Sequence, residues 1–314
     1  MTLRKEFITL LMTIVALMPI IGFAANEIQV PGVWGFTPAS TQGSYIRALF
    51  EQANIDQNKY QFIFENRPGA GGALATNYVL LHSKTLMVLA HSPALFIRPY
   101  LYPETTTYTF NQIKPVMVMA ISPTALLTKG RTLEQLVSQD IINIGTAGTG
   151  SSTHLMAEAF AGEIHKRYPN KIIQMVHFPS TNEAYLSVMG GHIDACFEYM
   201  GDAVAKATKD VTVIGITGKT KIKDYVLLKD AGYPEMEYMV LPFALFVAAD
   251  TPLDVIAELA TILLRAERVD SVQRLYKSDF GTKDDYMKIQ GDLMPWYNAM
   301  VKKFEKLTKG ISVK

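Results

Sequence analysis

The most constraining feature of this sequence is the alternation of short apolar runs with longer stretches of helical periodicity. Each run is a few residues long, rich in β-branched or aromatic side chains, and bounded by Gly, Pro, Ser or Asn. Such runs are typical of buried strands in a largely parallel sheet, so we predict doubly wound α/β sheets. The predicted strands are residues 28–36, 60–66, 85–92, 115–122, 142–148, 172–178, 210–218 and 243–250.

Two of the intervening stretches have clear helical signals. Residues 153–168 place their apolar side chains on one face. In residues 251–269, Thr251 is the expected N-cap and Pro252 the first helical residue. Both stretches follow predicted strands, as the helices of an α/β sheet do.

The length of 314 residues corresponds to about two domains. No linker rich in Gly, Ser or Pro separates two halves, so we expect the chain to cross between domains as strands, near residues 121–125 and 239–244. The expected first domain comprises residues 25–122 and 243–314. The expected second domain comprises residues 123–242.

The N-terminus has the pattern of a secretory signal peptide. Arg4 and Lys5 precede an uncharged, mostly apolar span at residues 7–23, and Gly22 and Ala24 occupy the −3 and −1 positions of a cleavage site. An uncleaved anchor is the alternative, but a bilayer needs about 20 apolar residues. We therefore predict export and cleavage after Ala24.

Charge and metal-ligating residues exclude several classes of function. Lys and Arg number 30 against 29 Asp and Glu, which argues against binding to nucleic acid or to an anionic membrane surface. The single cysteine, Cys196, excludes a disulfide framework. The six histidines show neither an H-E-x-x-H motif nor carboxylates at metal spacing. We predict no metal and no cofactor.

The strongest local motif is the glycine-rich loop GTAGTGSSTHL at residues 145–155. A predicted strand enters it and a predicted helix leaves it. Converging backbone N–H groups, the hydroxyls of Ser151, Ser152 and Thr153, and the helix N-terminus would together suit a carboxylate or a phosphate. Its G-x-x-G-x-G spacing is not that of a dinucleotide site. An ordinary glycine turn with a Ser/Thr cap explains the loop equally well.

Three further loops follow predicted strands, at residues 35–50, 66–75 and 90–99. All would lie at the edge where open α/β sheets bind ligands. Enzyme signatures are weaker. The GITGKT motif at residues 215–220 is two residues too short for a phosphate loop, and we interpret it as a strand end followed by a basic turn. Ser151 and His154 have no G-x-S-x-G context and no marked orienting acid.

Taken together, these motifs resemble the Bug family, the extracytoplasmic solute-binding proteins of tripartite tricarboxylate transporters. The most specific piece is ENRPGAGGALAT at residues 65–76, followed by residues 145–155 and by MGGHIDACF at residues 189–197. Residues 101–116 and 246–252 also fit. The pieces occur in the family's order and spacing over essentially the whole mature chain.

The resemblance implies a type II periplasmic-binding-protein fold, with two α/β domains, two crossing segments and a ligand cleft between the domains. It also implies a small carboxylate ligand, held by backbone amides, hydroxyls and water, with the N–H groups of residues 148–152 taking one carboxylate. The implied first-domain contacts are Thr37, Ala39, Ser40, His91 and Ser92. The implied second-domain contacts are Thr146, Ala147, Gly148, Thr149, Gly150, Ser151, Ser152, Thr153, His154 and Asp194.

The sequence departs from the family pattern at the expected ligand edge. A Gly-Gly pair in the first loop is replaced by Ala39-Ser40, and the Asp that follows it is replaced by Gly43, although Arg47 is kept. The V-P-Y-K-G of the second domain reads V-H-F-P-S at residues 176–180. These changes leave the identity of the ligand open.

Three functions fit the sequence. The first is a monomeric, non-enzymatic periplasmic protein that delivers a small carboxylate to the membrane permease subunits of a tripartite tricarboxylate transporter. The second is a sensor or adaptor on the same fold that signals to a membrane receptor. The third is a periplasmic hydrolase using Ser151 and His154. Fold alone does not decide among them.

Overall fold

The computed structural model describes residues 27–38, 40–104, 106–279 and 293–309. The predicted signal peptide and Ala39 lie outside these residues. The strands are β1 Ile28–Trp34, β2 Tyr60–Asn66, β3 Val88–His91, β4 Ile113–Ser122, β5 Thr124–Lys129, β6 Ile141–Thr146, β7 Ile172–His177, β8 Ala195–Tyr199, β9 Val211–Ile216 and β10 Leu241–Ala248. The α-helices are α2 Thr41–Ile55, α3 Ala73–Leu81, α4 Ala94–Leu101, α5 Leu133–Ser138, α6 Ser152–Arg167, α7 Thr181–Gly190, α8 Met200–Lys206, α9 Leu253–Glu267, α10 Asp270–Asp279 and α12 Leu293–Thr308. The 3₁₀ turns are η1 Ala70–Gly72, η2 Phe110–Gln112 and η3 Pro234–Tyr238.

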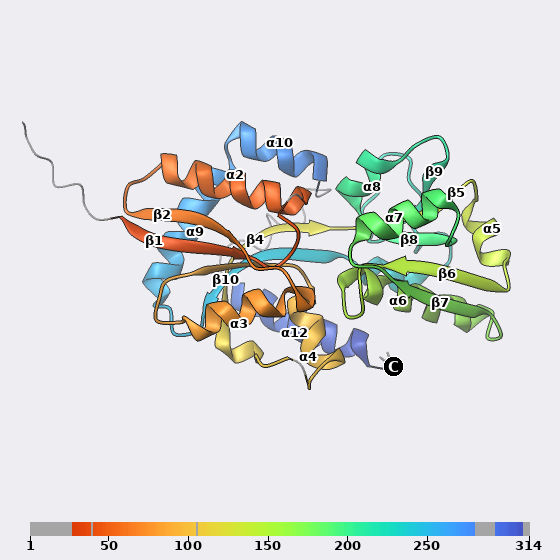
Figure 1. The fold of residues 1–314 in the computed structure, drawn as a ribbon, viewed down its shortest axis with the longest axis horizontal. Helices are drawn as coiled ribbons and strands as arrows, with labels where there is room; N and C mark the ends of the chain where they lie inside the picture. The colour runs from red at the N-terminus through yellow and green to blue at the C-terminus, as the bar shows by residue number, and fades with distance from the viewer. Residues whose placement is uncertain (1–26, 39, 105, 280–292, 310–314) are drawn as a thin grey trace, which may run out of the picture.

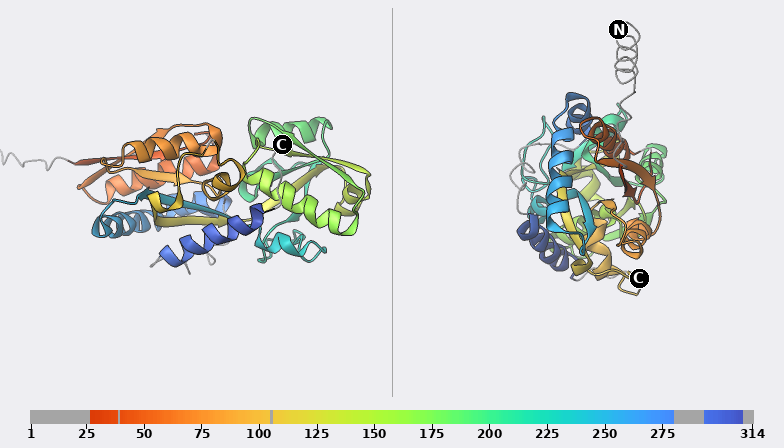
Figure 2. Two further views of the ribbon diagram at one scale, coloured as in Figure 1. Left: turned by 90° about the horizontal axis from the view of Figure 1, so that it is seen from below. Right: turned by 90° about the vertical axis from the view of Figure 1, so that its left-hand side faces the viewer.

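The strands form two five-stranded sheets, each the centre of one lobe (Figure 1). The first sheet has the order β2-β1-β3-β10-β4, and the second the order β7-β6-β8-β5-β9. The two lobes lie end to end along the long axis of the molecule, and helices cover both sheets (Figure 2). This is the two-lobed α/β architecture that the sequence predicts.

Each sheet contains one strand that runs against its neighbours, which the prediction of largely parallel sheets misses. β10 pairs antiparallel with β3 and β4, and β5 pairs antiparallel with β8 and β9. The physical reason is the crossing. Most strands follow a helix of their own lobe and run toward the other lobe. β5 and β10 instead begin where the chain arrives from the other lobe, so they run in the opposite direction.

The chain passes between the lobes twice. Only Pro123 separates β4 from β5, and the return path runs through residues 217–240 from β9 to β10. The first sheet therefore takes its strands from residues 28–122 and 241–248, and the second from residues 124–216. Domain boundaries at residues 122/123 and 242/243 stay a prediction.

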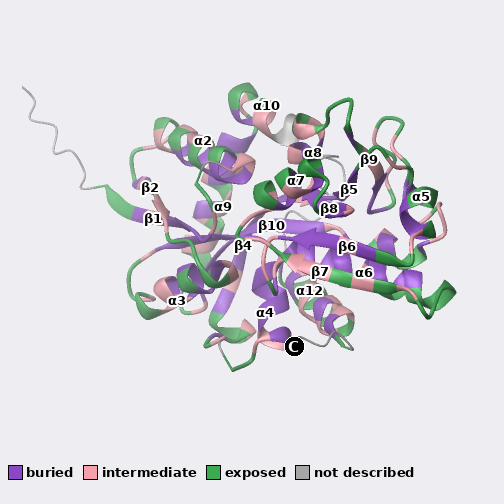
Figure 3. Cartoon of the chain, turned by 45° about the vertical axis from the view of Figure 1, so that its right-hand side comes forward, coloured by how far each residue is buried: buried purple, intermediate pink, exposed green. Residues whose placement is uncertain are grey.

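The core follows both sheets, whose central strands are buried beneath partly exposed helices (Figure 3). All eight residues of β10 are buried, as expected for a strand with both faces covered. Helix α9 begins one residue later than expected, because Pro252 has an extended ψ of 144° and is itself the N-cap in place of Thr251. Within the described residues, no helix combines the length and apolar character that a membrane span requires.

Candidate ligand site at the facing strand ends

The loops that follow β1, β3 and β6 lie where the two lobes meet. Contacts among the described residues join the lobes there. The Thr41 hydroxyl at the start of α2 donates a hydrogen bond to Asp202 in the first turn of α8. The Tyr102 ring, just after α4, lies so close to Gly150 that a Cβ on this glycine would be 2.2 Å from the ring. The structure thus brings the predicted first-lobe and second-lobe loops onto facing sides.

The loop between β6 and α6 is folded by the side chains that were predicted to bind the ligand. Ser151 is the N-cap of α6, and its Oγ accepts a hydrogen bond from the backbone N–H of His154 at 3.1 Å. Thr153 Oγ1 accepts from the Ala147 N–H at 2.9 Å. The Nδ1 atom of His154 accepts from the Gly150 N–H at 3.0 Å. These side chains therefore shape the loop from within.

Other donors of the same loop remain available. Of the described residues, none supplies a hydrogen-bond acceptor to the backbone N–H groups of Gly148, Ser152 and Thr153. Gly148 and Gly150 have φ values of +81° and +74°, a left-handed conformation that glycine adopts most readily. Ser152 and Thr153 are the first two residues of α6, where the helix dipole also favours an anion. The candidate anion site therefore offers mainly backbone amides.

Ser151 and His154 are not arranged as a nucleophile and its base. The Ser151 hydroxyl contacts Thr153 Oγ1 at 3.1 Å, and its partner on His154 is the backbone N–H, not the imidazole. The second imidazole nitrogen of His154, Nε2, lies 3.3 Å from Glu158. Both ring nitrogens are therefore occupied, which argues against the hydrolase hypothesis.

Thr146 and His177 form a further pair at the ends of β6 and β7. The Thr146 hydroxyl and His177 Nδ1 are 2.7 Å apart. The ring of His177 packs edge-on against that of His154, with 4.8 Å between centroids. Partial burial lowers the pKa of His177, and the neighbouring His154 lowers it further. The contact between Thr146 and His177 joins the ends of β6 and β7. Because its pKa is lowered, the His177 imidazole adds no positive charge near neutral pH.

In the first lobe, the predicted residues cap helix α2. Ser40 Oγ donates to the Thr37 carbonyl at 2.7 Å and accepts from the Gly43 N–H at 3.1 Å. A Cβ at Gly43 would lie 2.5 Å from the Pro38 carbonyl oxygen. This crowding explains why glycine stands at a position where the family pattern has Asp. Ala39 lies outside the described residues, so its predicted contact is untested.

His91 and Ser92 lie beneath the site, not on its surface. Both are buried, and His91 Nδ1 is 2.8 Å from the Ser92 carbonyl oxygen. The His91 ring packs edge-on against Phe36 and against Gly72, where a Cβ would come within 2.3 Å of Nε2. Burial lowers the pKa of His91 to about 4, so the imidazole is neutral at pH 7. These residues support the loop instead of presenting a polar surface to the ligand.

The structure does not bring Asp194 together with the ligand loops, and its binding role stays a prediction. Asp194 precedes β8, which runs toward the site, so its carboxylate lies at the opposite end of the strand. It accepts hydrogen bonds from the backbone N–H of Asn143 at 2.8 Å, from the Asn143 side-chain amide at 3.0 Å, and from Arg131 at 2.7 Å. These hydrogen bonds join β6, β8 and the segment before α5.

The structure adds two residues that the sequence did not single out, namely Tyr102 and Asp202. The Tyr102 phenol interacts with Thr149, and burial raises its pKa. Tyr102 belongs to the family-like segment 101–116, and Asp202 follows a strand end closely, so both signals were present in the sequence. Within the described ranges, no group of three or more His, Cys, Asp or Glu could hold a metal ion.

Several solved structures share this fold. MatC from Rhodopseudomonas palustris, solved with bound malate, matches with a TM-score of 0.75 and 18% identity, over 89% of this chain and 99% of that chain. A second R. palustris protein, solved with adipate, matches with a TM-score of 0.73 and 19% identity, over 90% and 96%. The periplasmic binding protein BugD matches with a TM-score of 0.73 and 17% identity, over 90% and 96%.

A search of curated proteins finds no match. The model of the tripartite tricarboxylate transporter family receptor, TctC, matches residues 50–312. The matched residues include the anion loop of the second lobe. They also include every strand of both sheets except β1. With the architecture and the family-like motifs already described, this match confirms the resemblance seen in the sequence. The chain belongs to the TctC family of tripartite tricarboxylate transporter receptors, which have a periplasmic solute-binding fold.

Proposed function

We propose that this protein captures a small carboxylate between its two lobes in the periplasm and delivers it to a tripartite tricarboxylate-type permease. The observation that carries the proposal is the set of available N–H groups on Gly148, Ser152 and Thr153. They lie at a helix N-terminus on the side that faces the first lobe. The malate and adipate in two similar structures support the same ligand class.

The ligand class follows from the charges around the site. The amides and the α6 dipole provide partial positive charge for one carboxylate. Asp202 adds a negative charge where α8 meets the first lobe. A second carboxylate placed near Asp202 would be repelled, whereas a hydroxyl or amine could donate to it. We therefore expect acids with one carboxylate and a hydrogen-bond donor to bind better than dicarboxylates of the same length.

The proposal is tested by removing one N–H group. Ser152 is the first residue of α6, and Ser151 before it has φ −71° and ψ 164°, a conformation that a following proline accepts. Ser152→Pro therefore deletes the donor and spares the helix. Because a hydrogen bond to a charged group contributes about 1.5–3 kcal/mol, carboxylate affinity should fall roughly 10- to 150-fold. Calorimetric titration with malate, adipate and lactate measures it.

Ser152→Ala is the matched control, since it removes the hydroxyl and keeps the N–H. It should lose less affinity than Ser152→Pro, because the backbone donor assigned to the carboxylate remains. Equal affinities for the proline and alanine variants would contradict the assigned role of the amide. Delivery is tested separately by uptake of the bound acid in cells with and without the gene. Unchanged uptake would favour the sensor alternative.

A further inference from the structure

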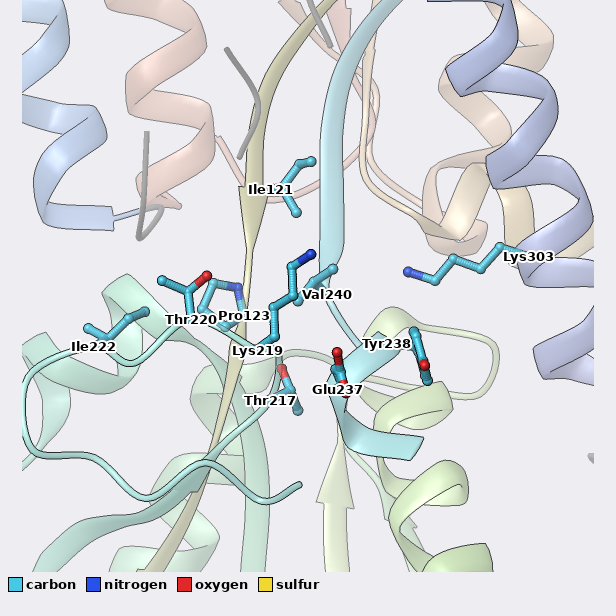
Figure 4. A pocket seen from close by; sticks show the side chains of 11 residues that line it. Ile121, Pro123, Thr217, Lys219, Thr220, Ile222, Glu237, Tyr238, Val240 and Lys303 are labelled. Atoms are coloured by element: carbon cyan, nitrogen blue, oxygen red, sulfur yellow. The ribbon is translucent and has the colours of Figure 1, made fainter. Parts of the chain in front are cut away.

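A pocket lies at the crossing between the lobes (Figure 4). Its volume is about 200 Å³, and its walls come from the β4–β5 crossing, the segment after β9, the segment before β10, and helix α12. None of its lining residues belongs to the loops that carry the candidate ligand site. It is a separate feature of the molecule.

The pocket is lined by two lysines from different lobes. Lys219 belongs to the GITGKT motif after β9, and Lys303 projects from α12, which packs on the first lobe (Figure 4). Lys303 is half-buried, and no carboxylate of the described residues lies within ion-pair distance of its Nζ atom. Loss of hydration lowers its pKa to about 8. Glu237 also lines the pocket, so the three side chains carry a net charge of +1 when Lys303 is protonated.

The surroundings favour a carboxylate over a phosphate. A phosphate loop needs free backbone amides, but the Gly218 N–H donates to the Met236 carbonyl at 2.9 Å and the Thr217 N–H to the Thr124 carbonyl at 2.9 Å. Two amides of the GITGKT motif are therefore already bonded within the protein, so the motif lacks the full set of amides of a phosphate loop. The remaining walls are mixed, with the apolar side chains of Ile121, Pro123, Ile222 and Val240 beside Thr217, Thr220 and Tyr238. Such walls suit the body of an organic acid.

We propose that this pocket is a second binding site, specific for a small monocarboxylate with an apolar body. The carboxylate lies between Lys219 and Lys303, and the apolar body lies against Ile121 and Val240. A net charge of +1 matches one negative charge. Because the two lysines belong to different lobes, the bound acid connects them beside the crossing segments. The site does not depend on the function proposed for the cleft.

The test is calorimetric titration of the whole protein with butyrate and benzoate, with inorganic phosphate as the comparison anion. Lys303→Met keeps the aliphatic stem and removes the charge, and it should weaken binding of both acids at least tenfold. Lys219→Met should act in the same direction. Lys302→Met is the matched control, since Lys302 is exposed on the same helix, and it should bind like the parent. Phosphate should bind more weakly than either acid.

Three results would overturn the proposal. One is the absence of saturable binding of both acids to the parent protein. Another is equal affinity in the Lys303→Met and Lys302→Met variants, or, if Lys303→Met does not fold, in Lys219→Met and Lys302→Met. The third is a loss of binding in Ser152→Pro, which would place these acids in the cleft. Conversely, a cleft that fails to bind malate, adipate and lactate would leave this proposal standing.

Discussion

His91 is a fully buried histidine at the end of β3, under the loops of the first lobe. Burial lowers its pKa to about 4, against about 6.5 in the unfolded chain. Between these values the unfolded state binds the extra proton, so the free energy of unfolding falls as the pH falls from 6.5 to 4. The expected loss from this one group is about 3 kcal/mol over the window. Urea unfolding at pH 7 and pH 4.5 measures it.

The contribution of His91 to the pH dependence of stability is isolated by comparing two variants with the parent protein. A folded His91→Asn variant should lose less stability than the parent between pH 7 and pH 4.5, because asparagine does not titrate. His192→Asn is the control, since His192 is exposed, and this variant should follow the parent. Parallel pH profiles for His91→Asn and the parent would show that His91 is not held neutral by the fold.

At the scale of elements, the loop between β6 and α6 depends on Gly150. Its φ is +74°, and a Cβ would meet the Tyr102 ring at 2.2 Å. Gly130 has a similar φ of +63° with open space around it. Gly130→Ala should cost about 1–2 kcal/mol for the left-handed backbone alone. Gly150→Ala should cost more than that, since Tyr102 must also move, and thermal unfolding of the two variants gives the difference.

The Tyr102 contribution can be removed independently. In a Tyr102→Ala background, Gly150→Ala should cost no more than Gly130→Ala, because only backbone strain remains. If Gly150→Ala and Gly130→Ala destabilise the parent equally, the contact between Tyr102 and Gly150 does not hold the lobes together in solution.

The same loop shows how far sequence reasoning reaches. The glycine-rich motif between a strand and a helix predicts a turn with available amides, because only local backbone geometry is needed. Which amides stay available depends on rotamers, here those that turn Thr153 toward Ala147 and His154 toward Gly150. The periodicity of apolar residues in a sequence carries no information about side-chain rotamers. Likewise the direction of β5 and β10 depends on which lobe each strand enters from, and that is a property of the whole chain.

At the scale of the whole molecule, the lobes are joined by few polar contacts across the candidate site. The Thr41 hydroxyl donates to Asp202, connecting the N-terminal turns of α2 and α8. This bond exists only while the lobes are together, so it stabilises that arrangement over any in which they separate. A ligand that bridges the lobes gains from the same arrangement. The bond should therefore affect both the shape of the protein and its affinity.

Thr41→Val removes the donor at nearly constant volume, and Asp202→Asn keeps an acceptor for the Thr41 hydroxyl. A hydrogen bond to a carboxylate of about 1.5 kcal/mol corresponds to roughly tenfold in the equilibrium between joined and separated lobes. We expect Thr41→Val to enlarge the radius of gyration measured by small-angle X-ray scattering without ligand and to weaken carboxylate binding up to tenfold. Asp202→Asn should change the radius of gyration less than Thr41→Val does.

Asp202→Asn should also improve the affinity for dicarboxylates relative to monocarboxylates, because the negative charge of Asp202 that repels a second carboxylate is gone. An unchanged radius and affinity in Thr41→Val would mean that the lobes are held together by packing at the crossing segments, and not by contacts across the site.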